Sequence, residues 1–216
     1  MAQIKLAVGV PAYGMSITAW QAEMWTKLGF ALAHAEARFQ LRSFIVVDVC
    51  GIDVARNRMV QEAIDADCDW LLMIDADTWH DDGFDLLQMV STAAHEGATV
   101  VAGPVPRRDP DDPHLMVYNA AGQVAKLSAT VPLVPIASAA TAIMAIDLTF
   151  VRHKMTPPWF VFEWTEGSTK PTKSEDLVFC ERVLNAGGSI RADTRFRANH
   201  LGRTPVHIGD PTRRKL

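Results

Sequence analysis

The sequence is poor in the features that define several common classes of protein. Its three cysteines, Cys50, Cys68 and Cys180, are too few and too scattered for a disulfide framework, and none forms a C-x-x-C pair. No run of about 18 apolar residues occurs, so a membrane-spanning helix is not expected. The first residues also lack the order of a signal peptide. These absences predict a protein with reduced thiols and a cytoplasmic location.

Charge of one sign is also missing, and so are two nucleotide-binding motifs. The formal net charge is −4, so no general basic field is present to hold a polyanion. Only residues 213–215 form a basic cluster, which we expect to be solvated. No G-x-G-x-x-G run occurs, which argues against a dehydrogenase. Gly9 and Gly14 have the spacing of a P-loop, but Met15 stands where that motif requires lysine.

The composition that remains is that of an ordinary globular domain. The chain has 216 residues, of which 49% are hydrophobic and 21% charged, which fits one domain better than two. Strand and helix patterns alternate in its first half, with strands predicted at 4–10, 43–49, 70–74 and 99–102 and helices at 18–38, 53–66 and 84–96. Asp53 is the expected N-cap of the second helix. This alternation predicts an α/β fold with a mostly parallel central sheet flanked by helices, and ligands beyond the carboxyl ends of its strands.

The second half is less regular. Residues 104–135 are rich in proline and predict a long loop with a hairpin that pairs 115–118 with 124–127. The later elements are strands at 136–146, 159–164, 189–192 and 197–200, helices at 150–154 and 175–186, and a mobile loop at 167–173. We therefore expect a single domain with a nucleotide-binding half at 1–103, an acceptor-side half at 104–203 and a tail at 204–216.

The sharpest chemical signal is the pair Asp75 and Asp77, separated by Ala76. They follow the apolar strand 70–74 directly, where the chain must turn, so both carboxylates can converge on one ligand. Carboxylates suit hard Mg²⁺ or Mn²⁺, and the diphosphate of a nucleotide would complete the coordination shell. The competing interpretation is a pair of solvated acids at the start of a helix.

Other candidate residues lie further along the chain. Glu175 and Asp176 open an amphipathic helix, where the helix dipole alone favours acids, but a carboxylate there could also act as a general base. Arg56 is suited to contact a phosphate or hold Asp75, or it forms an exposed ion pair on its helix. His200 is either a structural residue or a metal ligand. Two aromatic side chains are candidates for stacking on an acceptor sugar, Trp159 and Trp164.

The order of these motifs resembles that of the GT-A glycosyltransferases, which have a Rossmann-like fold, and is most similar to their family 2-like group. The resemblance covers residues 4–203. It is carried by Val10-Pro11-Ala12-Tyr13, Ala55-Arg56-Asn57, Asp75-Ala76-Asp77, Ser174-Glu175-Asp176-x-x-Phe179-Cys180 and His200.

The resemblance implies a role for each motif. The nucleotide of a UDP- or GDP-linked sugar is expected at the donor-binding residues Pro11, Ala12, Tyr13, Arg56, Asp75, Ala76 and Asp77. A metal ion is expected on Asp75, Asp77 and His200. Asp176, or else Glu175, is the expected base that takes the proton of the acceptor hydroxyl.

The expected reaction is the transfer of a sugar from the nucleotide diphosphate to an acceptor that is a sugar, a small molecule or a modified nucleic-acid base. Positive charge near the phosphates is expected from Arg107, Arg108 or Arg203, and closure over the donor from the loop 167–173. No Q-x-x-R-W motif occurs, which argues against a processive synthase. Residues 137–142 lack the glycine that many relatives carry before the acceptor site, so the acceptor stays open, as do the stereochemical outcome and the oligomeric state.

Two other classes of protein share parts of this pattern. A haloacid-dehalogenase-like phosphatase also needs an apolar strand that ends in D-x-D, but Trp79 stands here where that motif places threonine. A non-catalytic protein that binds nucleotide sugars would keep the fold and the donor site without turnover.

Overall fold

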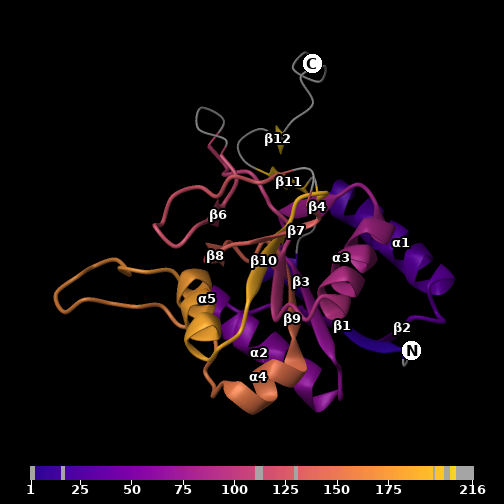
Figure 1. Cartoon of the computed structure of the whole chain (residues 1–216), viewed down its shortest axis with the longest axis horizontal. Helices are drawn as coiled ribbons and strands as arrows, with labels where there is room; N and C mark the ends of the chain where they lie inside the picture. The colour runs from indigo at the N-terminus through magenta and orange to yellow at the C-terminus, as the bar shows by residue number, and fades with distance from the viewer. Residues whose placement is uncertain are drawn as a thin grey trace.

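The computed structural model describes residues 3–15, 18–109, 114–128, 131–196, 198–201 and 205–207. Its centre is one seven-stranded sheet (Figure 1). The strands lie in the spatial order β2 (Phe39–Val47), β1 (Ile4–Pro11), β3 (Trp70–Ile74), β9 (Ile143–Asp147), β5 (Val100–Ala102), β10 (Ile190–Asp193) and β7 (Leu133–Pro135).

The sheet is mostly parallel, as the sequence predicts. β1 pairs in parallel with β2 and β3, and β5 pairs in parallel with β10. β9 runs between β3 and β5 and is antiparallel to both, and β7 is antiparallel to β10 at the far edge. Five strands therefore share one direction, and the ends of β1, β2 and β3 open at the same edge of the sheet.

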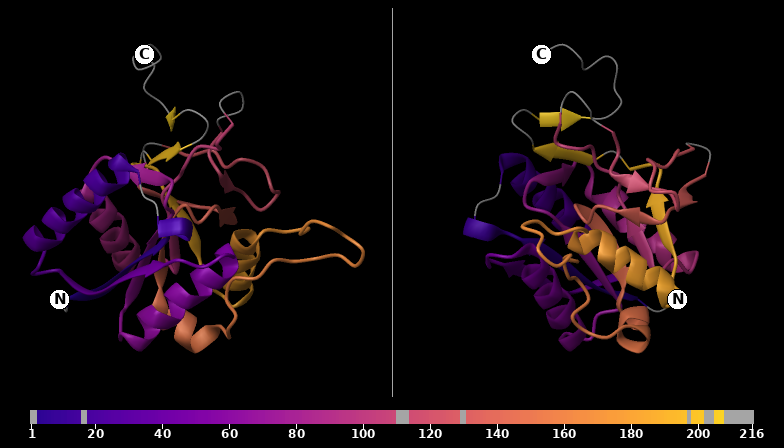
Figure 2. Two further views of the ribbon diagram at one scale, coloured as in Figure 1. Left: turned by 180° about the vertical axis from the view of Figure 1, so that it is seen from behind. Right: turned by 90° about the vertical axis from the view of Figure 1, so that its left-hand side faces the viewer.

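Helices cover both faces of the sheet (Figures 1 and 2). On one face lie α1 (Ala19–His34) and α3 (Gly83–His95), and on the other lie α2 (Ile52–Asp65), α4 (Leu148–Lys154) and α5 (Glu175–Asn185). Strand β3 shows why its sequence is apolar throughout: Leu72 and Ile74 join the core under α1 and α3, while Leu71 and Met73 join the core under α2. A strand that is buried on both faces reads as a continuous hydrophobic run rather than an alternating one.

Two small sheets complete the fold. The first has the order β12 (Pro205–His207), β11 (Ala198–Leu201) and β4 (Thr78–His80), and the second pairs β6 (Val117–Tyr118) with β8 (Ser138–Ala139). The predicted hairpin forms only in part. Tyr118 makes an antiparallel bridge with Val124, and the Ala125 N–H donates to the Val117 carbonyl at 2.8 Å, but the strand that pairs with β6 is β8.

Several predicted boundaries need correction. The predicted strand 136–146 is two strands, β8 and β9, and residues 159–164 form no strand beyond one bridge between Glu163 and Lys173. The N-cap of α2 is Gly51 rather than Asp53, which lies inside the first turn. Gly51 has φ 114°, a conformation that glycine adopts readily and side-chain residues avoid.

A long arm leaves the body of the molecule just before α5, and Figure 1 shows it in orange, stretching away from α4 and α5. Its two ends are held together where the Thr172 N–H donates to the Glu163 carbonyl at 2.8 Å. The Lys173 ammonium binds Glu163 and Glu181. The arm therefore has a fixed base, next to the residues that begin α5.

Within the described residues, none of the helices has both the length and the apolar character needed to cross a bilayer.

Candidate active site

The Asp75-Ala76-Asp77 turn follows directly on β3, as predicted, and neighbouring segments hold its backbone in place. The Asp75 N–H donates to the Ala142 carbonyl at 2.8 Å, and the Thr78 N–H donates to the Asp75 carbonyl at 3.1 Å. The Leu201 N–H donates to the Asp77 carbonyl at 2.8 Å. Two distant parts of the chain and one hydrogen bond within the turn thus fix the backbone from which the two carboxylates project.

Gln21 adds a further restraint that the sequence reasoning missed. It is the third helical residue of α1 and completes a capping box with Thr18, whose hydroxyl accepts from the Gln21 N–H at 3.1 Å. The side-chain amide then donates to the carbonyls of Asp75, at 2.8 Å, and Thr78, at 3.3 Å. The pattern T-x-x-Q is a known signal for a helix start, but nothing in it predicts the second role.

Arg56 connects the turn to α5. Its Nη2 donates to both carboxylate oxygens of Asp75, at 3.1 and 3.0 Å, and its Nη1 donates to Glu175. The side chains of Arg56 and Glu175 are 5% and 6% exposed, whereas Asp75 is 21% exposed. Arg56 therefore holds Asp75, one of the two roles expected for it, and forms a buried link between α2, β3 and α5.

Burial and neighbouring charges shift the pKa values of Arg56 and Glu175 in opposite directions. Burial by itself lowers the pKa of the Arg56 guanidinium, but the carboxylates of Asp75, Glu175 and Asp176 outweigh it and leave the pKa above its ordinary value. Burial raises the pKa of the Glu175 carboxyl, although Arg56 pulls that pKa down. The Arg56 guanidinium therefore offsets part of the cost of burying the Glu175 carboxylate.

A second cluster joins Asp77, His200 and Arg108. Strands β4 and β11 pair so that Thr78 lies opposite His200, which brings His200 Nε2 to 3.6 Å from Asp77 Oδ1. Arg108 Nε donates to His200 Nε2 at 2.9 Å, and Arg108 Nη2 contacts Asp77 Oδ2. No pattern in the sequence predicts β4, the strand whose pairing brings His200 beside Asp77.

The hydrogen bonds of His200 assign its tautomer. Nδ1 lies 2.8 Å from the carbonyl of Pro106, to which it can only donate, so the proton sits on Nδ1 and Nε2 carries a lone pair. Burial lowers the pKa of His200, and the charge of Arg108 lowers it further against the opposing bond to Pro106. The ring is therefore held neutral, with its lone pair directed toward Arg108 and Asp77.

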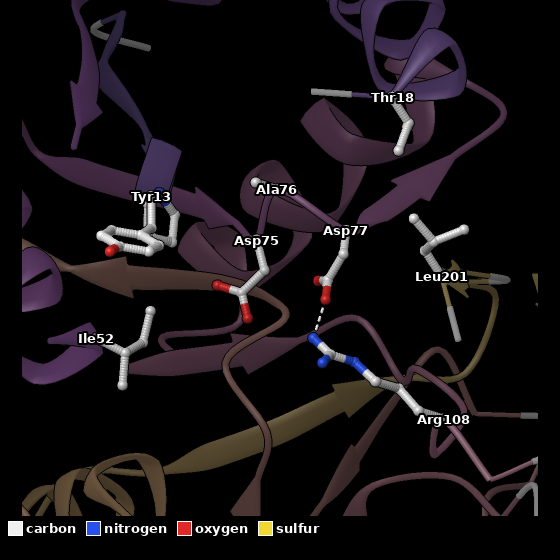
Figure 3. Close-up of a pocket in the computed structure, with 9 residues that line it drawn as sticks. Tyr13, Thr18, Ile52, Asp75, Ala76, Asp77, Arg108 and Leu201 are labelled. Carbon is white, nitrogen blue, oxygen red and sulfur yellow. Dashed lines mark hydrogen bonds and ion pairs between the residues drawn. The ribbon is translucent and has the colours of Figure 1, made fainter. Parts of the chain in front are cut away.

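The predicted metal set of Asp75, Asp77 and His200 is not assembled in this structure. In the part of the chain that the structure describes, no three His, Cys, Asp or Glu side chains gather as ligands of one ion. Asp77 and His200 do lie together, but Asp75 is drawn to Arg56, and Figure 3 shows its carboxylate apart from the contact between Asp77 and Arg108. The two aspartates are therefore not placed as ligands of one ion in this structure, although both line one cavity.

A cavity of about 410 Å³ opens over this turn (Figure 3). Tyr13 and Ile52 lie toward one end, Asp75 in the middle, and Asp77 with Arg108 beyond it. The lining residues are Pro11, Tyr13, Thr18, Ile52, Asp75, Ala76, Asp77, Arg108 and Leu201. Of the predicted donor contacts, Ala12 is buried and Arg56 acts through Asp75, so neither lines the cavity.

The two tryptophans expected to contact the acceptor differ in their exposure to solvent. Trp164 is 58% exposed, but Trp159 is 5% exposed and packs in the core beneath α2 and α5. Asn57 pins this segment, because its side-chain oxygen accepts from the N–H groups of Trp159 and Phe160 at 2.7 and 3.0 Å. Trp159 is therefore a structural residue, which corrects the expectation that it stacks on a sugar.

The two acids at the start of α5 have different surroundings. Glu175 is committed to Arg56, whereas Asp176 accepts from the Ser174 hydroxyl and, at 2.8 Å, from the Leu177 N–H. Asp176 is half-buried.

Among the predicted phosphate contacts, Arg108 lines the cavity and Arg107 does not, while Arg203 lies outside the described residues.

Part of this chain matches a model of a known protein family. Residues 46–144 match the model of the family described as Glycosyl transferase family 2. The match covers less than half of the chain, so the similarity to this family is a property of residues 46–144. The predicted resemblance to GT-A glycosyltransferases of the family 2-like group, and the predicted glycosyltransferase activity, are confirmed by this match. The matched segment contains Arg56, Asp75, Asp77 and Arg108, and it ends before the acids of α5 and His200.

One solved structure confirms the fold of the chain. The A197 protein from STIV aligns with 96% of this chain and 95% of its own, at a TM-score of 0.64 and 16% sequence identity. Two other structures are less similar. TarS from S. aureus has a TM-score of 0.47, 14% identity and coverage of 88% and 58%. A mutant of Drosophila beta-1,4-galactosyltransferase 7, in complex with manganese, UDP-Gal and xylobiose, has a TM-score of 0.42 and 15% identity. The alignment covers 98% of this chain and 74% of that one. No curated protein matches the sequence.

The buried position of Arg56 leads to a prediction about stability. The variant Arg56→Met leaves Glu175 buried without its partner, and breaking a buried ion pair in this way costs about 3–5 kcal/mol of unfolding free energy near pH 8. The folded-state pKa of Glu175 then rises further above that of the unfolded chain, so the native state holds the proton longer and stability falls as pH increases through that window. Urea unfolding at pH 5 and pH 8 is the measurement, and the loss should be smaller at pH 5.

The matched control is the double variant Arg56→Met with Glu175→Gln. It removes the uncompensated charge, so it should recover part of the lost stability at pH 8 and depend less on pH than the single variant. A loss of the same size at both pH values, with no recovery in the double variant, would mean that the charge of Glu175 is not what Arg56 compensates.

Proposed function

We propose that this protein transfers a sugar from a UDP- or GDP-linked donor to an acceptor hydroxyl, with Mn²⁺ or Mg²⁺ as cofactor. The observation that carries the proposal is the order of groups along the cavity. The aromatic ring of Tyr13 and the side chain of Ile52 suit a nucleotide base, Asp75 suits the ribose hydroxyls, and Asp77 with Arg108 suits a charged diphosphate.

The chemistry of the donor set supports a divalent ion at Asp77 and His200. One carboxylate and one neutral imidazole with a lone pair at Nε2 are ligands that such ions accept, and Pro106 orients the ring from behind, as metal-bound histidines require. Arg108 now places a positive charge between these two groups. When bound, the ion would supply charge neutralisation at the leaving diphosphate.

The residues of the chain itself perform the remaining tasks. Arg56 holds both carboxylate oxygens of Asp75 in place for a contact with the ribose, and Gln21 fixes the turn that carries Asp75. Asp176 is our candidate for the general base, because Glu175 is buried against Arg56 and lacks access to an acceptor. A carboxylate at the start of α5 would take the proton of the attacking hydroxyl.

The acceptor would approach from the second half of the chain. Trp164 exposes its ring at the base of the arm that leads into α5, so it suits stacking on an acceptor with an apolar face. The proposed division of labour is a nucleotide-binding half at 1–103 and an acceptor-side half at 104–203. A cytoplasmic location belongs to the same proposal, and it rests on the free state of the three cysteines.

The geometry disfavours the phosphatase alternative. Such an enzyme needs the first aspartate as a free nucleophile, but both oxygens of Asp75 accept from Arg56. A non-catalytic nucleotide-sugar-binding protein stays open, and turnover separates it from the transferase.

Donor binding is tested by thermal unfolding of the full chain with UDP- and GDP-sugars, with and without Mn²⁺. We expect one nucleotide class to raise Tm by about 5 °C or more at 100 times its Kd, because ligand binding stabilises by mass action. In Asp77→Asn the Mn²⁺-dependent part of that increase should disappear. Asp81→Asn is the matched control, since it neutralises an exposed acid just beyond β4. If Asp77→Asn keeps the full increase, the assignment of Asp77 is wrong.

The role of Asp176 is tested by the rate at which nucleotide is released from the donor, with water or a supplied sugar as acceptor. Asp176→Asn should lower kcat by about 10²–10⁴-fold, which is the usual contribution of a general base, while donor affinity stays at the wild-type value. Glu181→Gln removes the same charge further along α5 and should leave kcat unchanged. An unchanged kcat in Asp176→Asn would assign the base elsewhere, and the absence of any turnover in the wild type would favour the non-catalytic protein.

A further inference from the structure

Arg108 makes two contacts that a metal ion at this site would need for itself. Its Nη2 contacts one carboxylate oxygen of Asp77, and its Nε donates to His200 Nε2 at 2.9 Å. The other oxygen of Asp77 lies 3.6 Å from the same imidazole nitrogen. A guanidinium is a donor on every nitrogen and carries a fixed positive charge, so it satisfies these two acceptors as a cation would.

His200 Nε2 cannot accept the hydrogen bond of Arg108 and coordinate a metal ion at the same time. Its Nδ1 proton is committed to the carbonyl of Pro106 at 2.8 Å, which leaves Nε2 with a single lone pair. That lone pair now accepts the hydrogen bond of Arg108. A metal ion that coordinates Nε2 therefore requires this hydrogen bond to break.

The three side chains differ in how firmly they are held. The side chain of His200 is 6% exposed and that of Asp77 is 26% exposed, but that of Arg108 is 59% exposed. His200 lies in β11, and Asp77 directly precedes β4 with its carbonyl bound to the Leu201 N–H, whereas the guanidinium belongs to an exposed side chain. Exposed ion pairs are weak because water screens them, so Arg108 is the partner that can leave.

We propose that Arg108 is an exchangeable internal cation: it neutralises Asp77 and occupies His200 Nε2 in the free protein, and a divalent ion takes its place. This inference rests on the proposed metal site at Asp77 and His200. Once displaced, Arg108 still lines the donor cavity, and its planar fork of donors suits the oxygens of a diphosphate. Arg108 would then pass from the protein's carboxylate to the phosphates of the donor as the ion binds.

Binding of Mn²⁺ alone to the chelator-treated full chain tests the exchange without any activity measurement. Free Mn²⁺ is counted by electron paramagnetic resonance for the wild type, Arg108→Ala, Arg107→Ala and the double variant Arg108→Ala with Asp77→Asn. We expect Arg108→Ala to bind Mn²⁺ about threefold more tightly or better, because only an exposed ion pair and one hydrogen bond need to be displaced in the wild type. The double variant should lose this binding.

Arg107→Ala separates displacement from a change in local charge, since it removes a positive charge at the adjacent position. Equal tightening in Arg107→Ala and Arg108→Ala would overturn the exchange, and so would an unchanged or weaker affinity in Arg108→Ala. Both of those results leave the metal-dependent donor site standing. If neither the wild type nor Arg108→Ala binds Mn²⁺, even with UDP or GDP present, both the exchange and the proposed metal dependence fail.

Discussion

A single buried guanidinium organises the candidate active site. Arg56 reaches from α2 to Asp75 at the end of β3 and to Glu175 at the start of α5. The net stability from such a pair is small, because the cost of desolvating the charges offsets their attraction. Its effect is geometric: Asp75 is held in place at the end of β3, and the first turn of α5, which carries Asp176, is tied to the same guanidinium.

The two aspartates of the turn are paired in different ways, and the difference has a functional meaning. Asp75 is matched by a cation that is almost fully buried, whereas Asp77 is matched by Arg108, which is 59% exposed. The first pair behaves as part of the framework. The second pair is exposed to solvent, and it is the pair that we propose a divalent ion displaces.

The elements that the sequence predicts well are those with a strong local pattern. Strand β3 is recognisable because burial on both faces makes it apolar throughout, and the acids that end it then stand out. Strand β4 has only three residues and no such pattern, so the pairing that brings His200 to Asp77 could be inferred only through the family resemblance. The burial of Trp159 is likewise set by Asn57, which lies far away in the chain. Contacts of this kind depend on the assembled fold, and no local signal records them.

The central claim is that the cavity beyond β3 binds a nucleotide diphosphate with its charge beside Asp77. Diffraction from crystals grown with UDP or GDP and Mn²⁺, with data collected at the manganese absorption edge, tests it most directly. The account predicts an anomalous peak in contact with Asp77 and His200, nucleotide density between Tyr13 and Asp75, and Arg108 moved away from His200. Nucleotide bound elsewhere, or a manganese peak remote from Asp77, would contradict it.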